Sequence, residues 1–150
     1  MTLTIRKGTI EDENAVLDLL EQLFEPPGGF PHGYTRERGS EGFRHAVASP
    51  DADILLAVDG EKVAGISSVY KDYLSMRDGW RTWLQDLVVG REQRGRGIGK
   101  MLLAASEEWA RDHGCTHLDL SSGLGRAGAH RFYEREEMTK GGYVFRRLLD

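Results

Sequence analysis

The segment from residue 87 to residue 100, LVVGREQRGRGIGK, constrains the fold of this chain more than any other. It leaves an apolar run, passes through a glycine-rich turn and opens an amphipathic helix with Ile98, Leu102 and Trp109 in its apolar stripe. Glycines allow a backbone to approach a bulky group closely, and the first amides of a helix point at such a group. Four basic side chains and one acid lie in the turn. The segment therefore predicts a strand, turn and helix that bind an anion; the alternative is a glycine-rich turn with solvated arginines.

Two common phosphate-binding patterns do not fit this turn. The dinucleotide pattern Gly-x-Gly-x-x-Gly fails because Lys100 stands where the third glycine belongs. A P-loop would need glycine at Arg94 and serine or threonine at Met101. The pattern that does fit is Arg94-x-x-Gly97-x-Gly99, after a strand and at the start of a helix.

Strands and helices alternate along the rest of the chain. Apolar and period-two runs predict strands at residues 3–6, 54–58, 63–70, 81–89, 116–121 and 143–149. Helical periodicity predicts helices at residues 9–24, 35–48, 98–114 and 127–136. The pair Asp59-Gly60 is a hairpin signal between two of the strands. These elements predict an α/β (mixed α+β) fold in a single domain over residues 1–150, with helices on both faces of a mixed sheet.

Composition indicates a globular protein of the cytoplasm. Of the 150 residues, 39% are hydrophobic and 29% are charged, which argues against a disordered chain. The net charge of −4 argues against nucleic-acid and membrane partners, because both surfaces attract positive charge. The single cysteine, Cys115, excludes an internal disulfide and a zinc site of paired cysteines. The histidines lack metal-ligand spacing, and the first residues lack a signal-peptide pattern, so we expect no metal and a cytoplasmic location.

A second motif, RAGAHRFYE at residues 126–134, follows a predicted strand and opens a predicted helix. With the turn, it resembles the GNAT N-acetyltransferase family, whose two signatures are Arg/Gln-x-x-Gly-x-Gly/Ala and Asn-x-x-Ala-x-x-Phe-Tyr followed by Gly-Phe. Ala129, Phe132 and Tyr133 match the second signature. Two motifs in the correct order are far more specific than either alone. The resemblance implies a GNAT-like domain: a mostly antiparallel mixed sheet of about six to seven strands, flanked by about four helices and splayed at its central parallel pair.

Three positions depart from the second signature. Arg126 stands in the asparagine slot, while Glu137 and Met138 stand in the glycine and phenylalanine slots. Because the family's asparagine contacts the pantetheine arm, we expect Arg126 to reach a phosphate instead. If the helix ends at Glu137 in the left-handed conformation, the missing glycine should cost about 1 kcal/mol.

The resemblance implies acetyl-CoA as the acyl donor. Its pantetheine arm would pair with the strand before the turn, and its pyrophosphate would meet the turn. The implied cofactor-binding residues are Leu87, Val88, Val89, Arg94, Gly95, Arg96, Gly97, Ile98, Gly99, Lys100, Arg126 and Tyr133. Tyr133 is also the implied catalytic residue, a general acid for the departing thiolate. Without the motif, a core aromatic beside Phe132 on an amphipathic helix would be the favoured interpretation of Tyr133; the motif reverses this preference.

No residue is assigned as the general base. Some members of the family place a glutamate on the strand before the turn, but the matching position is Gln85, which cannot accept a proton. Asp86 is adjacent, and strict strand alternation points it to the opposite face. Candidates elsewhere, none with a spacing argument, are His32, Tyr34, His45, Asp72 and the C-terminal carboxylate. An acceptor amine that is already partly neutral would need no base.

These observations predict an N-acetyltransferase that transfers an acetyl group from acetyl-CoA to a primary amine of a small molecule or a protein, by direct attack within a ternary complex. By the resemblance, the acceptor pocket is expected at residues 25–34 and 70–83. The second segment carries four aromatic residues, Tyr70, Tyr73, Trp80 and Trp83.

The alternative function is a catalytically silent acyl-CoA-binding sensor or interaction module. The substitutions at Gln85, Arg126 and Glu137 favour this alternative. A third function, nucleic-acid binding through residues 91–100, is disfavoured because only one short basic turn is present. Homodimers are common in the family, although no residue of this sequence argues for one.

Overall fold

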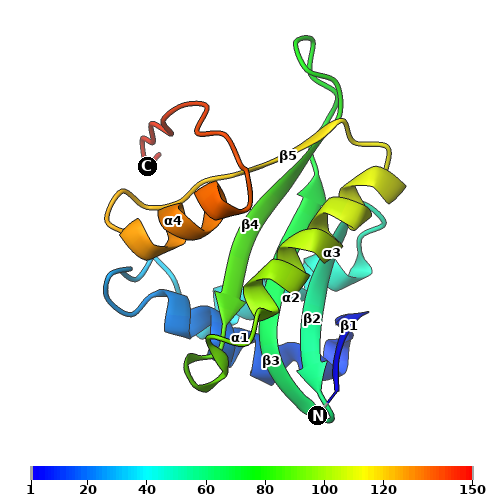
Figure 1. Cartoon of the computed structure of the whole chain (residues 1–150), viewed down its shortest axis with the longest axis vertical. Coiled ribbons are helices and arrows are strands. Elements are labelled where there is room, and N and C mark those ends of the chain that lie inside the picture. Colours follow the sequence, from blue (N-terminus) through cyan, green and yellow to red (C-terminus); the bar gives the residue numbers. More distant parts are fainter. Residues whose placement is uncertain (1, 150) are drawn as a thin grey trace.

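The computed structural model describes residues 2–149, which form a five-stranded sheet with helices on both faces (Figure 1). The strands are β1 (Leu3–Lys7), β2 (Ala52–Asp59), β3 (Lys62–Lys71), β4 (Arg81–Val89) and β5 (His117–Leu120). They lie in the order β1-β2-β3-β4-β5, antiparallel except for the parallel pair β4–β5. The predicted mixed α/β class and mostly antiparallel sheet are therefore confirmed. The parallel pair lies at the edge of the described sheet. The family resemblance had implied that this pair would be central.

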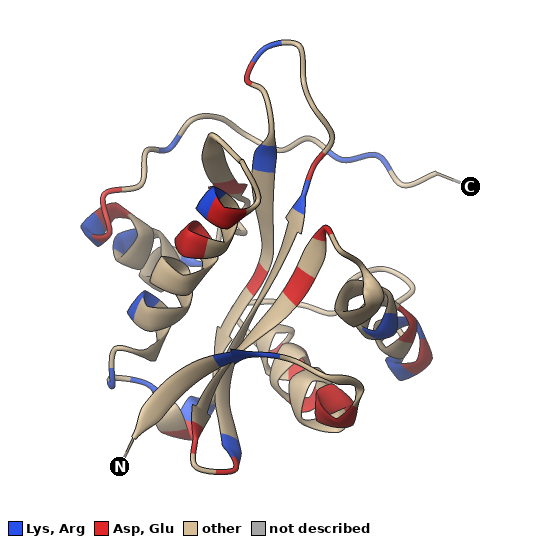
Figure 2. Cartoon of the chain, turned by 90° about the vertical axis from the view of Figure 1, so that its right-hand side faces the viewer, with Lys and Arg blue, Asp and Glu red and all other residues tan. Residues whose placement is uncertain are grey.

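The strand predicted over residues 143–149 does not form, so the sheet has five strands instead of six or seven. A strand needs a hydrogen-bonded partner, and residues 139–149 pair with none of the described strands. Figure 2 shows this C-terminal segment extending away from the sheet and the helices. Its large apolar side chains are exposed: Tyr143, Val144, Phe145, Leu148 and Leu149. The local pattern alone was insufficient to build the element.

Two helices cover one face of the sheet. They are α1 (Glu13–Leu23), which follows a single 3-10 turn, and α2 (Arg36–Ala48). Val16 and Leu19 of α1 and Phe43 of α2 pack against Val88 of β4 in one apolar cluster. The residue before α2, Thr35, accepts a hydrogen bond from the backbone amide of Arg38 at 3.1 Å. This cap explains why the helix begins where the sequence predicted.

The opposite face is covered by α3 (Ile98–Asp112) and α4 (Ala127–Arg135). Contact between α3 and β3 is so close at Gly65 that a Cβ atom there would lie 3.0 Å from the side chains of both Ile98 and Leu102. The first turn of α3 is therefore seated directly on the sheet. No helix of the described residues is long and apolar enough to cross a membrane.

The end of α4 has the conformation that its sequence penalises. Glu137 has φ +64°, in the left-handed region. Its amide donates to the carbonyl of Glu134 at 3.0 Å, and the amide of Met138 donates to the carbonyl of Tyr133 at 3.0 Å. These two bonds form a Schellman motif, in which glycine is the usual left-handed residue. The expected left-handed helix end at Glu137 is confirmed, and its cost of about 1 kcal/mol applies.

Two strand irregularities differ from the sequence prediction. In the β2–β3 hairpin, Asp59 pairs with Lys62, so the two loop residues are Gly60 and Glu61, one position later than predicted. The second irregularity is a bulge in β4. Gln85 is an extra residue there, because the pairing with β3 goes from Leu84 directly to Asp86. A bulge of this kind interrupts the alternation of side chains between the two faces.

The bulge overturns one expectation about the site. Leu84 packs against α3, whereas Val88 packs against α1 and α2. Asp86 lies two residues before Val88 in the part of β4 after the bulge, so its side chain points to the same face as that of Val88. Trp83, before the bulge, points to the face opposite Leu84, and its indole donates a hydrogen bond to Gln85. Gln85 and Asp86 therefore both face α1 and α2. The expectation that alternation points Asp86 to the opposite face was wrong.

Candidate active site

The glycine-rich turn ends in an uncapped helix. Gly95 and Gly97 have φ +82° and +77°, and Gly97 is the residue that precedes α3. No side chain caps this helix start, and the first helical bond runs from the amide of Met101 to the carbonyl of Gly97. The amides of residues 98–100 thus have no intrahelical acceptor. Such a cluster of free amides at the positive end of a helix is suited to an anion.

The basic side chains of the turn divide into two groups. Arg91 forms an ion pair with Glu25, and Arg96 donates to Asp59 at 3.2 Å. These two guanidinium groups therefore hold the turn to neighbouring segments. Arg94 and Lys100 are exposed and form no ion pair with any of residues 2–149. They are the two side chains of the turn that are available to an anionic ligand.

The strands β4 and β5 separate beside this turn. Their parallel pairing runs from Arg81 opposite His117 to Leu84 opposite Leu120 and then ends. The rest of β4, residues 85–89, keeps β3 on one side and has no strand partner among residues 2–149 on the other. A cavity of about 90 Å³, here called the small cavity, lies in the gap. The expected splay between the two parallel strands is therefore present.

Polar groups of the small cavity come mainly from the loop after β5 and from α4. Its lining includes Gln85, Ser121, Ser122, Arg126 and Tyr133. Burial raises the pKa of the Tyr133 phenol, and the nearby Arg126 opposes this shift. The phenol is therefore protonated at neutral pH and able to donate a proton or a hydrogen bond.

Ser122 was not singled out from the sequence. Its Oγ atom is buried and has no hydrogen-bond partner among the described residues. Buried hydroxyl groups are nearly always paired, so an unpaired one in the wall of a cavity indicates a place for a ligand's polar atom. The only signal in the sequence was the position of Ser121-Ser122-Gly123 directly after a strand.

Arg126 joins α4 to the end of α1. Its Nη2 atom donates to the carbonyl of Leu23 at 2.8 Å, and a Cβ atom added at Gly28 would clash with it. The guanidinium thus packs against the proline-rich loop and lines the small cavity. The expectation that it reaches a phosphate stays a prediction.

A second cavity, here called the large cavity, has a volume of about 540 Å³ and lies between the helices α1 and α2 and the sheet. Gln85 lines both cavities, so they adjoin at the bulge of β4. The segments expected to form an acceptor pocket contribute only Tyr70 and Lys71 to its lining. Tyr73, by contrast, is 82% exposed. Most of the wall comes from α1, α2, β2 and the part of β3 before Tyr70, outside the two expected segments.

Asp86 carries the carboxylate of the large cavity. Its Oδ2 atom accepts a hydrogen bond from Ser68 Oγ at 2.8 Å, and its backbone amide donates to the same Oγ at 3.0 Å. Burial raises the pKa of Asp86 above that of an ordinary carboxyl group, and the Ser68 bond offsets part of this rise. A carboxylate with these properties is a stronger base than one in water.

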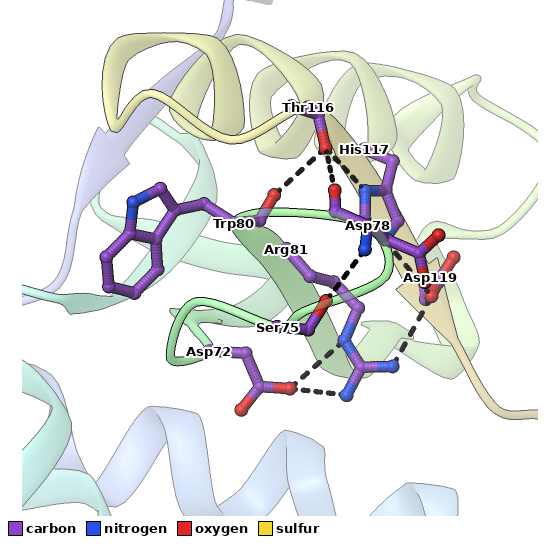
Figure 3. Close-up of polar contacts among 8 residues, drawn as sticks. All are labelled: Asp72, Ser75, Asp78, Trp80, Arg81, Thr116, His117 and Asp119. Atoms are coloured by element: carbon purple, nitrogen blue, oxygen red, sulfur yellow. Dashed lines mark hydrogen bonds and ion pairs between the residues drawn. The ribbon is translucent and has the colours of Figure 1, made fainter.

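The loop over residues 72–80 is fastened to the start of β5 (Figure 3). Arg81 bonds to Asp72 and, at 3.4 Å, to Asp119. The hydroxyl of Thr116 donates to the carbonyl of Trp80 at 3.2 Å. This network holds the far end of the β4–β5 pair together, so the gap between the two strands opens only toward the glycine-rich turn.

Two of the residues considered as bases have other partners. Asp72 is ion-paired with Arg81. The Tyr34 hydroxyl donates to Glu21 at 2.9 Å, and burial raises the pKa of this phenol to about 12. The Tyr34 phenol is therefore protonated at neutral pH and cannot accept a proton from an amine, and the Asp72 carboxylate is occupied by Arg81. Among residues 2–149, no cluster of His, Cys, Asp or Glu side chains could hold a metal ion.

Comparisons with known proteins show which family the chain matches. A family model described as the acetyltransferase (GNAT) family matches residues 14–137. The aminoalkylphosphonate N-acetyltransferase of Salmonella typhimurium is 30% identical over 145 residues, which cover 97% of this chain and 90% of that protein.

Two solved structures share the fold at low sequence identity. Glucosamine-6-phosphate N-acetyltransferase from Arabidopsis thaliana has a TM-score of 0.79 at 23% identity, with all of both chains covered. The aminoglycoside N-acetyltransferase AAC(6')-Iy in complex with CoA has a TM-score of 0.83 at 17% identity, covering 98% of this chain and 95% of that one.

Proposed function

The chain belongs to the acetyltransferase (GNAT) family and is an N-acetyltransferase, and on that premise we propose that it transfers the acetyl group of acetyl-CoA to the primary amine of a small molecule. The observation that carries the proposal is the junction of the two cavities at Gln85. A proton donor, Tyr133, lines one cavity, and a carboxylate, Asp86, lines the other. Both kinds of group assist amine acylation: the base frees the amine nitrogen of a proton, and the acid supplies one to the departing sulfur.

Donor binding would use the turn and the free edge of β4. The diphosphate would accept hydrogen bonds from the amides of residues 98–100 and ion-pair with Arg94 and Lys100. Arg96, tied to Asp59, would contribute its backbone only. The unpartnered edge of β4 over residues 87–89 offers backbone groups to the amides of a pantetheine arm, in the manner of an added strand.

The fit of that arm is supported by the unpaired Ser122 hydroxyl in the wall of the small cavity. Here acetyl-CoA is a substrate that supplies a thioester carbonyl. Arg126 and Tyr133 complete the residues proposed for this side of the site.

In the chemical step the amine nitrogen attacks the thioester carbonyl carbon. A carbon–nitrogen bond forms, the carbon–sulfur bond breaks, and the sulfur leaves with the electron pair. Tyr133 donates a proton to that sulfur. Because ordinary pKa values are about 10 for a tyrosine phenol and about 8.5 for a thiol, this donation is partial, and the thiolate leaves mainly on its own stability.

The site weakens the argument for a silent acyl-CoA sensor. That argument relied on Gln85, which cannot accept a proton, in the position where other members carry a glutamate. Because Gln85 is a bulge residue, the next residue, Asp86, faces the same cavity and supplies a carboxylate. Enzyme and sensor are separated by a screen of amine acceptors that follows release of the CoA thiol.

Replacing Tyr133 by phenylalanine tests the proposed proton donor. We expect Tyr133→Phe to lower kcat by about 10²–10⁴-fold, because general acid catalysis supplies about that much, and to weaken acetyl-CoA binding, measured by calorimetry, by a much smaller factor. Tyr143→Phe, the same change on a side chain that is 72% exposed, is the control. Unaltered kcat in Tyr133→Phe would remove the acid from the mechanism. Acetyl-CoA binding without CoA release from any amine would favour the sensor.

A further inference from the structure

The lining of the large cavity bears on which amines the enzyme accepts. This inference rests on the proposed function. We propose that the acceptor is a small amine on an uncharged, apolar body. The body lies between α1, α2 and the sheet, and the ammonium group binds Asp86, which takes its proton. The acceptor class therefore differs from the aminoalkylphosphonate named for one relative and the aminoglycoside named for another.

The apolar part of the proposal comes from the wall of the large cavity. Its volume of about 540 Å³ is typical of pockets for small molecules. Apolar side chains from four elements line it: Val16, Leu17, Leu20, Phe43, Ala46, Ala52, Ile54, Ile66 and Val69. Burying an apolar ligand against such a wall lowers the free energy of binding, whereas burying a charged group there raises it.

The charged groups of the wall, apart from Asp86, already have partners. Asp53 accepts a hydrogen bond from Trp109 at 2.7 Å and ion-pairs with Lys7 at 3.5 Å. The ammonium of Lys71 lies 4.3 Å from the centre of the Trp80 ring. No arginine of the described residues lines the cavity. An acceptor with a phosphonate group would bury that anion without a bidentate partner, which is why we exclude it.

Asp86 is the exception among these groups. Ser68 bonds to its Oδ2 atom, and no described residue bonds to Oδ1. The other titratable side chains of the wall are His45 on α2 and Tyr70 on β3, with α1 contributing none. A partly buried carboxylate with one free oxygen is costly unless a cation meets it, and the substrate's ammonium is that cation.

Proton transfer then follows from the same contact. A primary amine is mostly ammonium at neutral pH, and its nitrogen attacks only after losing a proton. The N–H bond breaks toward Asp86 Oδ1, which releases the proton to water after the product leaves. The neutral amine attacks the thioester carbonyl beside Gln85, which lines both cavities. The tetrahedral intermediate loses its second N–H proton to water, and Tyr133, after giving its proton to the sulfur, regains one from water. The net reaction converts an ammonium and a thioester into an amide, a thiol and one proton.

A panel of three amines tests the acceptor class. We compare 2-phenylethylamine, 2-aminoethylphosphonic acid and the polycation neamine, and measure kcat/KM from thiol release by the full chain. The expected result is a value for phenylethylamine at least 10-fold above the other two. A higher value for the phosphonate or for neamine would overturn the acceptor class while leaving the acetyltransferase function intact.

Two variants test the placement of the amine. Asp86→Asn keeps the side-chain shape and should lower kcat/KM for phenylethylamine by about 10²–10⁴-fold, and the fall of activity at low pH should disappear. Asp112→Asn, the same change on an exposed residue of α3, is the control. Gly42→Leu fills open space on the wall, since no atom lies within 4 Å of a Cβ there, and should raise KM.

A binding measurement separates failure of this inference from failure of the proposed function. Calorimetry with phenylethylamine in the presence of CoA needs no turnover. Binding by wild type that is weakened at least 10-fold in Asp86→Asn supports the inference even if no CoA is released in the activity assay. Equal kcat/KM and equal binding in wild type and Asp86→Asn would overturn it, with the acetyltransferase activity unaffected.

Discussion

At the scale of single residues, two carboxyl groups show opposite adaptations. Asp12 accepts hydrogen bonds from Arg6 and from the Thr9 amide, which lower its pKa to about 2. Its contribution to stability is present above the unfolded pKa and is lost as pH falls toward 2. Asp86 has one hydroxyl partner, and burial raises its pKa. Asp12 holds the start of the first helix in place, whereas Asp86 is held in a state that costs stability.

Asp86→Asn should therefore stabilise the fold. The folded pKa of Asp86 lies above its unfolded value, so wild type loses stability as pH rises through the folded pKa, and asparagine does not. We expect the variant to melt a few degrees above wild type at pH 7, with a smaller difference at pH 4, by differential scanning calorimetry. Equal melting temperatures at both pH values would mean that the Asp86 carboxylate is not under strain.

At the scale of elements, two local irregularities build the site. The bulge in β4 turns Gln85 and Asp86 toward the same face, and the left-handed glycines before α3 leave its first amides free. The bulge lies in the middle of β4, and the glycines lie directly before the start of α3. Gly65, which has no side chain, lets the first turn of α3 pack directly on β3.

A pair of glycine substitutions isolates the role of the turn. Gly97 and Gly60 have φ +77° and +63°, and at either position a Cβ atom would have no neighbouring atom within 4 Å. Alanine at either position should cost about 1 kcal/mol of stability. Only Gly97→Ala should also weaken acetyl-CoA binding, by about fivefold, because relief of the strain moves the amides of α3.

Calorimetric Kd values and melting temperatures of both variants check this prediction. Gly60→Ala is the control, because the β2–β3 hairpin carries the same backbone penalty away from the site. A Gly97→Ala variant that binds acetyl-CoA as tightly as Gly60→Ala would show that the turn does not hold the diphosphate.

At the scale of the whole molecule, the sheet separates the two substrates. The donor side opens between β4 and β5 under α4, and the acceptor side lies under α1 and α2. Gln85, at the bulge, lines both cavities. The described C-terminal segment, residues 139–149, takes part in neither cavity and in none of the three apolar clusters.

A chain that ends at Gly142 tests the independence of this segment. Because the removed side chains are exposed, we expect the melting temperature to change by less than about 2 °C, within the range of a surface change. The kcat/KM for amine acceptors should also be unchanged. A fall of many degrees would show that the segment packs on the fold in solution, as the strand predicted from its sequence would.

Local patterns were sufficient for the regular elements. The strand over residues 81–89 has the predicted bounds, and α3 and α4 begin at the predicted residues 98 and 127. Apolar periodicity, capping groups and glycines act over a few residues, so they can be read along the chain. The turn and the second motif identified the family for the same reason, because their spacing is local.

Only the tertiary structure decided which residues meet at the site. The side of the sheet that Asp86 faces depends on its pairing with Ser68, and the partner of Arg126 is the carbonyl of Leu23, far away in sequence. The segment over residues 143–149 has a strand pattern but no described strand beside it. The sequence by itself determined the elements and the family, because those depend on neighbouring residues; the structure decided register and enclosure, because those depend on contacts between distant ones.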